Sequence, residues 1–319
     1  MITTTVGNYP KVAEDSYSTK LIGSISKWQR QELTKAQLEG VFQEITQAVI
    51  KEQEATGLDL LTDGQIRWED LVSPLASRLS GFEINGLTRY FDNNVYYRRP
   101  ILRQAPRRTT PLLVQEYQAA KACTSKPLKA ILPGPYTFVK MSEDAYYKSE
   151  RRFVRRMAEI LNEEAHGLER AGASFIQFDE PALGFDKPNM ALVVEALNIA
   201  ADGLKAKSAV YTYFGSLNGT LAPLMRAKVD VIGLDVVSDP QALATLGRTR
   251  VTKELALGCL DARNTKLESV AELHALFNGV KKLFPLDRLY INPNCGLEFL
   301  PHDAALRKIQ RMQEAVASY

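Results

Sequence analysis

The sequence predicts an α/β fold in which eight parallel strands alternate with helices to form a (β/α)8 TIM barrel. Eight short apolar runs punctuate the chain, and a helix-like stretch follows each of them. The chain also lacks a G-x-G-x-x-G turn, which the alternative, an open doubly wound sheet, would more often carry after its first strand. Barrels of this class commonly exceed about 250 residues as one unit. We therefore expect residues 1–319 to form a single domain.

The first predicted strand covers residues 2–6, ends at Gly7-Asn8-Tyr9-Pro10, and precedes an amphipathic helix over residues 34–56. The same pattern of apolar run, polar or Gly/Pro ending and helical stretch continues along the chain. The later strands are predicted at residues 58–62, 128–132, 174–178, 209–213, 231–235, 254–258 and 289–292. Long outer helices with charged faces are predicted at residues 150–171, 189–207 and 301–317.

A longer insertion over residues 82–103 follows the second strand-helix unit. Its Tyr, Phe, Asn and Val content, together with the turn-forming Asp92, Asn93 and Asn94, predicts a β-hairpin. Such a hairpin would cover the mouth of the barrel or carry a surface for a partner.

Composition and charge exclude several classes of protein. Hydrophobic residues make up 45% of the chain and charged residues 24%, as in globular proteins. The net charge of +3, with Lys and Arg interspersed among Asp and Glu, argues against a nucleic-acid partner. No apolar stretch approaches the roughly 20 residues that span a membrane, and the first residues lack a signal-peptide pattern. Three cysteines without close spacing are unlike a disulfide framework, so we expect a cytoplasmic protein with reduced thiols.

Polar residues that follow the strands are candidates for the site, because the C-terminal strand ends of a barrel converge on one mouth. Asp63 either caps the turn after the second strand or is functional. Asp179 and Glu180 follow the fourth strand, and two adjacent carboxylates repel unless a cation lies nearby. A bound ammonium group or a structural salt bridge would supply that cation. Asp235 ends the sixth strand, and Cys295 follows the eighth.

The remaining potential metal ligands are sparse, although zinc needs about four N, S or O donors. His166 and His274 fall inside helix patterns and are expected at the surface or in packing. His302 either reaches the mouth of the barrel or caps the final helix. Cys123 and Cys259 are expected to pack as small hydrophobic residues.

Six strand-end motifs follow one another along the chain. They are Val6-Gly7-Asn8-Tyr9-Pro10, Leu61-Thr62-Asp63-Gly64-Gln65, Tyr96-Tyr97-Arg98-Arg99-Pro100, Pro133-Gly134-Pro135-Tyr136-Thr137, Ile176-Gln177-Phe178-Asp179-Glu180-Pro181-Ala182-Leu183 and Asn292-Pro293-Asn294-Cys295-Gly296-Leu297. Together they resemble the cobalamin-independent methionine synthase family over essentially the whole chain. The resemblance is to short forms with the C-terminal catalytic barrel alone, without the N-terminal barrel that full-length members use for folate polyglutamate. It implies a TIM barrel that transfers a methyl group to homocysteine in methionine biosynthesis.

The resemblance also implies an atypical zinc site. Family members bind zinc through a His-x-Cys pair after the fifth strand, a Glu after the sixth and a Cys before Gly-Leu after the eighth. In this chain Tyr213 and Gly215 stand at the His and Cys positions, Asp235 stands at the Glu position, and Cys295 is retained. Either His302 and water complete an unusual site, or the barrel binds no metal. Without zinc, Tyr213 or Cys295 would act as a general base, or the acceptor would be another nucleophile such as carbon or nitrogen.

Other positions of the resemblance assign substrate contacts. Arg263 stands where full-length members have a histidine used in proton transfer, and a guanidinium group binds an anion rather than carrying protons. Gln65 replaces a Glu. Asp179 matches the residue that binds the amino group of homocysteine, and Asn8 with the Gly7 backbone falls where its carboxylate is bound. The candidate catalytic residues are thus Asp179, Arg263 and Tyr213, and the candidate substrate-binding residues are Gly7, Asn8, Gln65, Asp179 and Glu180.

The leading interpretation is a methyltransferase that acts on a small amino-acid-like substrate. Its methyl donor is expected to differ from a folate polyglutamate. The resemblance suggests instead a methyl-corrinoid protein, or another methyl-donor protein, that docks over the hairpin at residues 82–103.

Two rival interpretations belong to other classes. The first is a related C–S lyase or transferase that binds an anionic substrate through Arg98, Arg99 and Arg263. The alternative role of these arginines is pairing with the carboxylates of Asp63, Glu69 or Asp261. The second rival is a metal-free subunit that binds a partner through its hairpin. The aromatic residues that would serve it, unless they pack on the barrel, are Tyr90, Phe91, Tyr96 and Tyr97.

Overall fold

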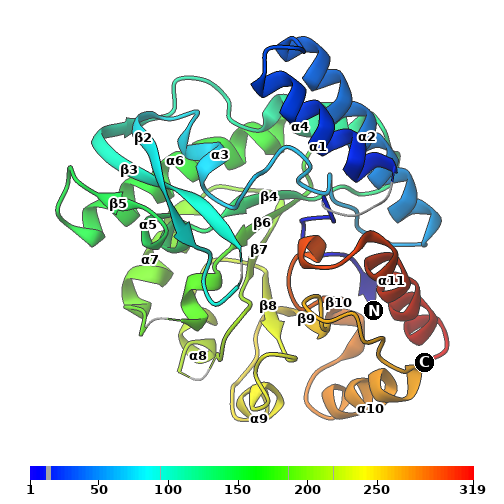
Figure 1. Ribbon diagram of the computed structural model, residues 1–319. Coiled ribbons are helices and arrows are strands. Elements are labelled where there is room, and N and C mark those ends of the chain that lie inside the picture. The colour runs from blue at the N-terminus through cyan, green and yellow to red at the C-terminus, as the bar shows by residue number, and fades with distance from the viewer. Residues whose placement is uncertain (12–15, 94, 186, 218) are drawn as a thin grey trace. The chain divides into compact units, whose positions relative to one another are not determined.

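The computed structural model describes residues 1–11, 16–93, 95–185, 187–217 and 219–319 (Figure 1). The chain divides into two compact units, each of which combines parallel strands with helices. Unit 1 comprises Met1–Arg67, Gln118–Leu128 and Leu257–Tyr319, and unit 2 comprises Trp68–Tyr117 and Lys129–Ala256.

Parallel pairing joins the strands of unit 1. They are β1 (Ile2–Thr3), β10 (Leu289–Pro293) and the C-terminal part of β9 (Glu254–Leu260). β10 lies between β1 and β9, and β1 pairs with it in parallel. Single parallel bridges also join Thr4 to Leu60 and Leu61 to Leu128. The predicted strand at residues 58–62 is therefore reduced to these two bridges in the structure.

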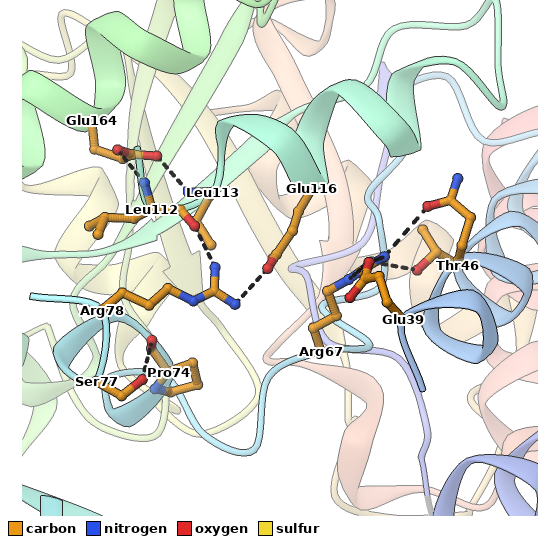
Figure 2. Close-up of polar contacts among 11 residues, drawn as sticks. Glu39, Thr46, Arg67, Pro74, Ser77, Arg78, Leu112, Leu113, Glu116 and Glu164 are labelled. Atoms are coloured by element: carbon orange, nitrogen blue, oxygen red, sulfur yellow. Dashed lines mark hydrogen bonds and ion pairs between the residues drawn. The ribbon is translucent and has the colours of Figure 1, made fainter. Parts of the chain in front are cut away.

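Side-chain caps explain where two of the helices of unit 1, at residues 35–55 and 270–281, begin. These helices are α1 (Ser16–Gln29), α2 (Lys35–Ala55), α10 (Val270–Lys281) and α11 (His302–Ala317), with the 3-10 turns η2 (Leu286–Arg288) and η3 (Leu297–Phe299). Thr34 and Gln37 exchange side chain-to-backbone hydrogen bonds in a capping box before α2. Arg67 then binds the Glu39 carboxylate and the Thr46 hydroxyl of α2 (Figure 2). α4 (Val114–Lys121) crosses the division between the units.

The strands of unit 2 place two aspartates at the same sheet edge. These strands are β4 (Ala130–Pro133), β6 (Phe175–Asp179), β7 (Lys207–Tyr211) and β8 (Val231–Asp235). They lie in the order β8-β7-β6-β4, with the start of β9 beside β8. Every residue of β4, β6 and β8 is buried, as expected for parallel strands that are covered on both faces. Because β6 and β8 run in parallel, their final residues Asp179 and Asp235 lie at the same edge.

A second, three-stranded sheet in unit 2 contains most of the predicted insertion. It consists of β2 (Ser80–Arg89), β3 (Tyr96–Arg107) and β5 (Glu143–Asp144), with β2 antiparallel and β5 parallel to β3. Asn94, one residue of the predicted turn, lies outside the described residues. The Tyr97 hydroxyl donates to the Met141 carbonyl at 2.8 Å, and the Phe82 ring contacts the Phe138 ring. These contacts hold the sheet against the segments that follow β4.

The helices of unit 2 are α3 (Ser73–Ala76), α5 (Pro135–Lys140), α6 (Glu150–Arg170), α7 (Met190–Ala200), α8 (Leu221–Leu224) and α9 (Ala242–Gly247), with the 3-10 turn η1 (Pro181–Gly184). The buried Glu164 of α6 accepts hydrogen bonds from the N–H groups of Leu112 and Leu113 (Figure 2). The helix predicted at 189–207 ends at Ala200, before a turn at Gly203, where φ is 72°. Within the described part of the chain, no helix is long and apolar enough to cross a membrane.

Candidate functional site

Asp179, at the C-terminal end of β6, is a carboxylate bound by side chains. Only 2% of this residue is exposed. Its Oδ1 accepts a hydrogen bond from the Gln177 amide at 2.7 Å, and its Oδ2 accepts one from the Tyr213 hydroxyl at 3.2 Å. Parallel pairing of β6 with β4 on one side and β7 on the other fixes the position of this carboxylate. The structure thus brings together two of the predicted residues, Asp179 and Tyr213.

A buried lysine supplies positive charge close to Asp179. The Lys129 ammonium group donates to the side-chain oxygen Oε1 of Gln177 at 2.7 Å and lies 4.8 Å from the centre of the Tyr211 ring. Burial lowers the pKa of Lys129 to about 7, and the negative charge of Asp179 opposes this shift. The cation expected near the adjacent carboxylates is therefore a residue of the chain, Lys129. The Gln177 side chain lies between its ammonium group and Asp179 and is hydrogen-bonded to both. Sequence reasoning missed both residues, although a lysine inside the apolar run at residues 128–132 is a signal that could have revealed them.

Glu180, the neighbour of Asp179, is bound to the start of a helix. Its two carboxylate oxygens accept the N–H groups of Tyr136 and Thr137, at 2.9 and 2.7 Å, in the first turn of α5. Burial raises the pKa of Glu180 to about 7. A β-carbon at Gly134 would overlap the Glu180 side chain, so this position requires glycine. These contacts account for the burial of Glu180 without a ligand, and its predicted substrate contact stays a prediction.

Asp235, at the end of β8, is a carboxylate that binds backbone groups. Its Oδ1 accepts the N–H groups of Val237 and Ser238, at 3.0 and 2.8 Å. Its Oδ2 accepts the N–H group of Phe214 at 3.1 Å. The carboxylate therefore closes its own turn and joins it to the segment that follows β7.

Gly215, which stands at the cysteine position of the resemblance, touches the backbone of Gly184. A β-carbon built at Gly215 would lie 2.6 Å from the carbonyl carbon of Gly184. A β-carbon at Gly184 would likewise lie 2.8 Å from the Cα of Gly215. Real β-carbons do not approach other atoms this closely, so no cysteine fits at position 215 unless one of the two segments moves.

An aromatic cluster connects Tyr213 to the loop between β2 and β3. The ring centre of Phe214 lies 4.7 Å from that of Tyr213 and 6.0 Å from those of Tyr90 and Phe91. The Phe91 ring also lies 5.0 Å from the Phe185 ring, a residue that is 41% exposed. Phe91 and Phe214 have φ angles of 49° and 73°, which is rare for bulky side chains. Strained backbone tends to persist at functional sites, so this cluster is a candidate part of the site.

The predicted substrate-binding residues of unit 1 lie in the loops after β1 and after Leu61. The Gly7 carbonyl accepts the Thr62 hydroxyl at 3.1 Å, and the Asn8 side-chain oxygen accepts the Lys11 ammonium group at 2.8 Å. Gln65 is 2% exposed and has a φ of 48°, and its amide Nε2 has no hydrogen-bond partner among the described residues. A buried amide donor without a partner on a left-handed backbone is consistent with a ligand contact.

Two carboxylates of unit 1 have raised pKa values for the same reason. Burial raises the pKa of Asp63, whose carboxylate accepts the N–H group of Gln65 at 2.9 Å and so forms the turn cap that was one of its predicted roles. Burial also raises the pKa of Glu298 to about 7, while the charge of Lys11 opposes that shift. Sequence reasoning missed Glu298, because nothing in its apolar neighbourhood distinguishes it.

Cys295 and His302 have separate surroundings in unit 1. Cys295 is fully buried, and its sulfur lies 3.5 Å from the Gly296 carbonyl oxygen. The His302 ring binds the Glu52 carboxylate at 2.8 Å, and the Tyr9 hydroxyl donates to the same carboxylate at 2.5 Å. The predicted cap of the final helix by His302 is wrong, because α11 begins without a side-chain cap and the imidazole binds α2 instead.

Of the arginines proposed to bind an anion, Arg98 and Arg263 are exposed and Arg99 is half-buried. Arg99 lies 3.7 Å from Glu143, which is not one of the carboxylates predicted to pair with it. Asp261 accepts the backbone N–H of Arg263 at 2.9 Å. The ion pair between Arg99 and Glu143 is partly exposed, and such pairs contribute little to stability.

Comparison with known proteins assigns the family. A family model described as "Cobalamin-independent synthase, Catalytic domain" matches residues 1–318. The chain belongs to the cobalamin-independent synthase family. A protein named methionine synthase from Saccharolobus solfataricus is 31% identical over 314 residues, and one from Saccharolobus islandicus is 33% identical over 316 residues. Each match covers 98% of this chain and 92% of the relative. The predicted resemblance is confirmed, and the chain is a methyltransferase of this synthase family.

Solved structures confirm the fold class of this family member. A B12-independent methionine synthase from Shewanella sp. W3-18-1, in complex with selenomethionine, matches with a TM-score of 0.85 and 24% identity. That match covers 99% of this chain and 97% of the other. A methyltransferase from Methanosarcina mazei matches with a TM-score of 0.62 and 13% identity, over 98% of this chain and 94% of the other. The predicted TIM-barrel class is therefore confirmed.

The zinc ligands implied for the synthase family are not completed in the described ranges of this chain. There, no group of three or more His, Cys, Asp and Glu side chains is placed to hold a metal ion. The Tyr213 hydroxyl donates to Asp179, Gly215 has no side-chain donor, and both oxygens of Asp235 accept backbone N–H groups. These residues do not fit a four-ligand zinc site.

Proposed function

We propose that this protein transfers a methyl group to an amino-acid-like acceptor of the homocysteine class, and that Asp179 binds the ammonium group of the acceptor. The observation that carries this proposal is a buried carboxylate that accepts hydrogen bonds from the side chains of Gln177 and Tyr213, at a strand end of a synthase-family chain. An ammonium group is a suitable ligand, because charge-assisted hydrogen bonds to a carboxylate are the strong ones. The 3.2 Å contact from Tyr213 is the longer of the two and is the one that a substrate would displace or share.

The other substrate contacts in this proposal come from the family resemblance. Gly7 and Asn8 would bind the carboxylate of the acceptor, and Arg263 would hold an anionic group of a substrate. The left-handed backbone and the unpartnered amide of Gln65 support its inclusion. The contacts of Glu180 with α5 favour a structural role for that carboxylate.

The chemistry requires that the acceptor sulfur lose its proton before or as it attacks the methyl group. We assign this proton to Tyr213, which would accept it as a general base after its own hydroxyl proton has passed to solvent, so that Asp179 keeps its negative charge for the ammonium group. The new S–C bond then forms as the bond between the methyl group and its donor breaks. This route uses residues that the structure brings together, and it involves no metal ion.

The donor in this proposal is an activated methyl carrier other than a folate polyglutamate. A methyl-corrinoid protein that docks on the loop between β2 and β3 is the donor we propose. The exposed ring of Phe185, which follows η1 and lies against Phe91 of this loop, supports a docking surface here, because exposed apolar surface can receive a partner.

Three measurements on protein purified without chelator test the proposal, namely methionine formation, zinc content and ligand binding. We expect methionine to form from homocysteine when free methylcobalamin is the probe donor, and we expect zinc well below one ion per chain by elemental analysis. About one zinc per chain would overturn the metal-free chemistry. Tight binding of dianionic compounds, together with no binding of homocysteine or methionine, would overturn the assignment of a homocysteine-like methyl acceptor. That result would favour the rival interpretation as a lyase.

A further inference from the structure

Four buried groups of unit 2 form a chain of hydrogen bonds that ends at the proposed ammonium site. Lys129 donates to the side-chain oxygen of Gln177 at 2.7 Å, and the Gln177 amide nitrogen donates to Asp179 at 2.7 Å. Tyr213 donates to the other oxygen of Asp179 at 3.2 Å. Lys129 and Asp179 are each 2% exposed, and Gln177 is fully buried. A buried chain of this kind is stable only when each member donates or accepts in a consistent direction.

Lysine sets the direction of this chain. In its charged form, which predominates below pH 7, the Lys129 ammonium group has three donors and no acceptor, so the partner atom on Gln177 must be its oxygen. The amide nitrogen then faces Asp179, and Asp179 can only accept. If the lysine were absent, the Gln177 amide could turn over and present its oxygen to Asp179. Two oxygens would then face each other unless Asp179 gained a proton, and a protonated carboxyl group is a poor partner for ammonium.

We propose that Lys129 is a positioning residue that acts through Gln177. It keeps the Asp179 carboxylate accepting hydrogen bonds, and the site therefore selects substrates that carry an ammonium group. This inference rests on the proposed function, because it concerns how the same substrate is recognised. It adds two residues, Lys129 and Gln177, that do not touch the substrate themselves. It also gives the buried position of Lys129 a purpose beyond its contact with the Tyr211 ring.

Calorimetric binding of two ligands at about pH 6, where Lys129 carries its charge, tests this selection. Methionine carries the ammonium group, and 4-(methylthio)butanoate has the same thioether and carboxylate without it. The wild-type protein should bind methionine at least about tenfold more tightly, the range expected for a hydrogen bond to a charged group. Lys129→Met and Gln177→Met should each reduce this preference to less than about threefold, with binding of the deamino compound unchanged.

A matched control and a double variant separate positioning from a merely structural role. Lys207→Met removes the lysine that begins β7 and pairs with Glu254. This variant should keep the wild-type preference for methionine. Lys129→Met combined with Asp179→Asn should show the same preference as Asp179→Asn alone, because both changes act on one contact. Gln177→Met keeps the inference testable if Lys129→Met does not fold.

The outcomes distinguish this inference from the proposed function. If Asp179→Asn loses the preference while Lys129→Met and Gln177→Met keep it, the inference is overturned and the proposed function stands. An equal loss of affinity for both ligands in Lys129→Met would show a structural role and would also overturn the inference. If the wild-type protein shows no preference for methionine, the proposed function fails together with the inference.

Discussion

The ends of β6 and β8 present the same residue type in two different ways. Each strand ends in a buried aspartate at the same edge of the sheet of unit 2. Asp179 is bound by the side chains of Gln177 and Tyr213, whereas Asp235 is bound by three backbone N–H groups. Backbone donors are fixed by the fold and cannot leave, but a side chain can rotate and give its place to a ligand. The difference supports our proposal that the end of β6 serves recognition, and it gives the carboxylate at the end of β8 a role in stability.

One residue, Phe214, contacts both strand ends. Phe214 donates its backbone N–H to Asp235, and its ring lies 4.7 Å from the ring of Tyr213, which binds Asp179. The hydrogen bond to Asp235 thus stabilises the backbone of Phe214 at its positive φ. The Asp235 carboxylate is in turn positioned by the N–H groups of Val237 and Ser238. Stability at the β8 end therefore supports the geometry at the β6 end.

Replacement of Asp235 with alanine should give the largest effect on stability. Three backbone N–H groups would lose their acceptor, and we expect the free energy of unfolding to fall by about 3 kcal/mol. Urea unfolding followed by circular dichroism measures this change. Glu159→Ala removes an exposed partner of Arg156 and should cost less than about 1 kcal/mol. Equal losses in the two variants would contradict the structural role of the β8 end.

Asp179→Asn should leave the fold intact and weaken methionine binding roughly 10- to 100-fold, because a charged acceptor is lost. The asparagine oxygen can still accept from Gln177, and its amide can donate to the Tyr213 oxygen. Calorimetry measures the affinity, and urea unfolding checks the fold. Unchanged affinity would remove the assignment of the ammonium site to the β6 end.

The pH dependence of stability should change when Lys129 is replaced by methionine. The pKa of Lys129 is about 7 in the folded protein and 10.5 in the unfolded chain, so the unfolded chain binds one more proton between these values. In this window the lysine makes the free energy of unfolding rise with pH, by up to about 1.4 kcal/mol per pH unit. Below pH 7 the lysine is charged in both states, and it lowers the free energy of unfolding by its full amount.

The measurement is the difference in unfolding free energy between wild type and Lys129→Met at several pH values. Other titrating groups cancel in this difference, which should shift in favour of the wild type from pH 7 to pH 10. Lys207→Met should show no such shift in that direction, since its lysine is half-exposed and paired with Glu254. A difference that stays constant with pH would show that Lys129 is charged throughout.

The smallest expected effect concerns the aromatic cluster that adjoins the β6 end. Phe91→Ala should lower the free energy of unfolding by about 1 kcal/mol, because ring pairs contribute roughly 0.5–1.5 kcal/mol. Phe91→Gly loses the same ring but tolerates a positive φ, so it should be about 1 kcal/mol more stable than Phe91→Ala. Equal stability of the two variants would show that the backbone at Phe91 is not strained.

The alternation of strands and helices could be predicted from the sequence, because buried parallel strands read as continuous apolar runs with polar endings. The same reasoning found Asp179, which directly follows such a run. It missed Lys129 and Gln177, because a polar residue inside an apolar run marks a buried contact only when its partner is known, and that partner lies on another strand. It also could not show why position 215 lacks a cysteine. That reason is a backbone contact with Gly184, which no local pattern encodes.

The meeting of Gly184 and Gly215 restricts the mutational routes by which a metal centre could be installed here. A cysteine at position 215 becomes tolerable only after η1 has shifted, and any larger residue at 184 meets the same obstacle from the opposite side. A histidine at position 213 would in addition release the hydroxyl that now binds Asp179. We expect each of these substitutions to be harmful when it occurs first, which would make their effects epistatic. A lineage that carries this pair of glycines can therefore elaborate its present chemistry more readily than it can exchange it for a thiolate-metal enzyme.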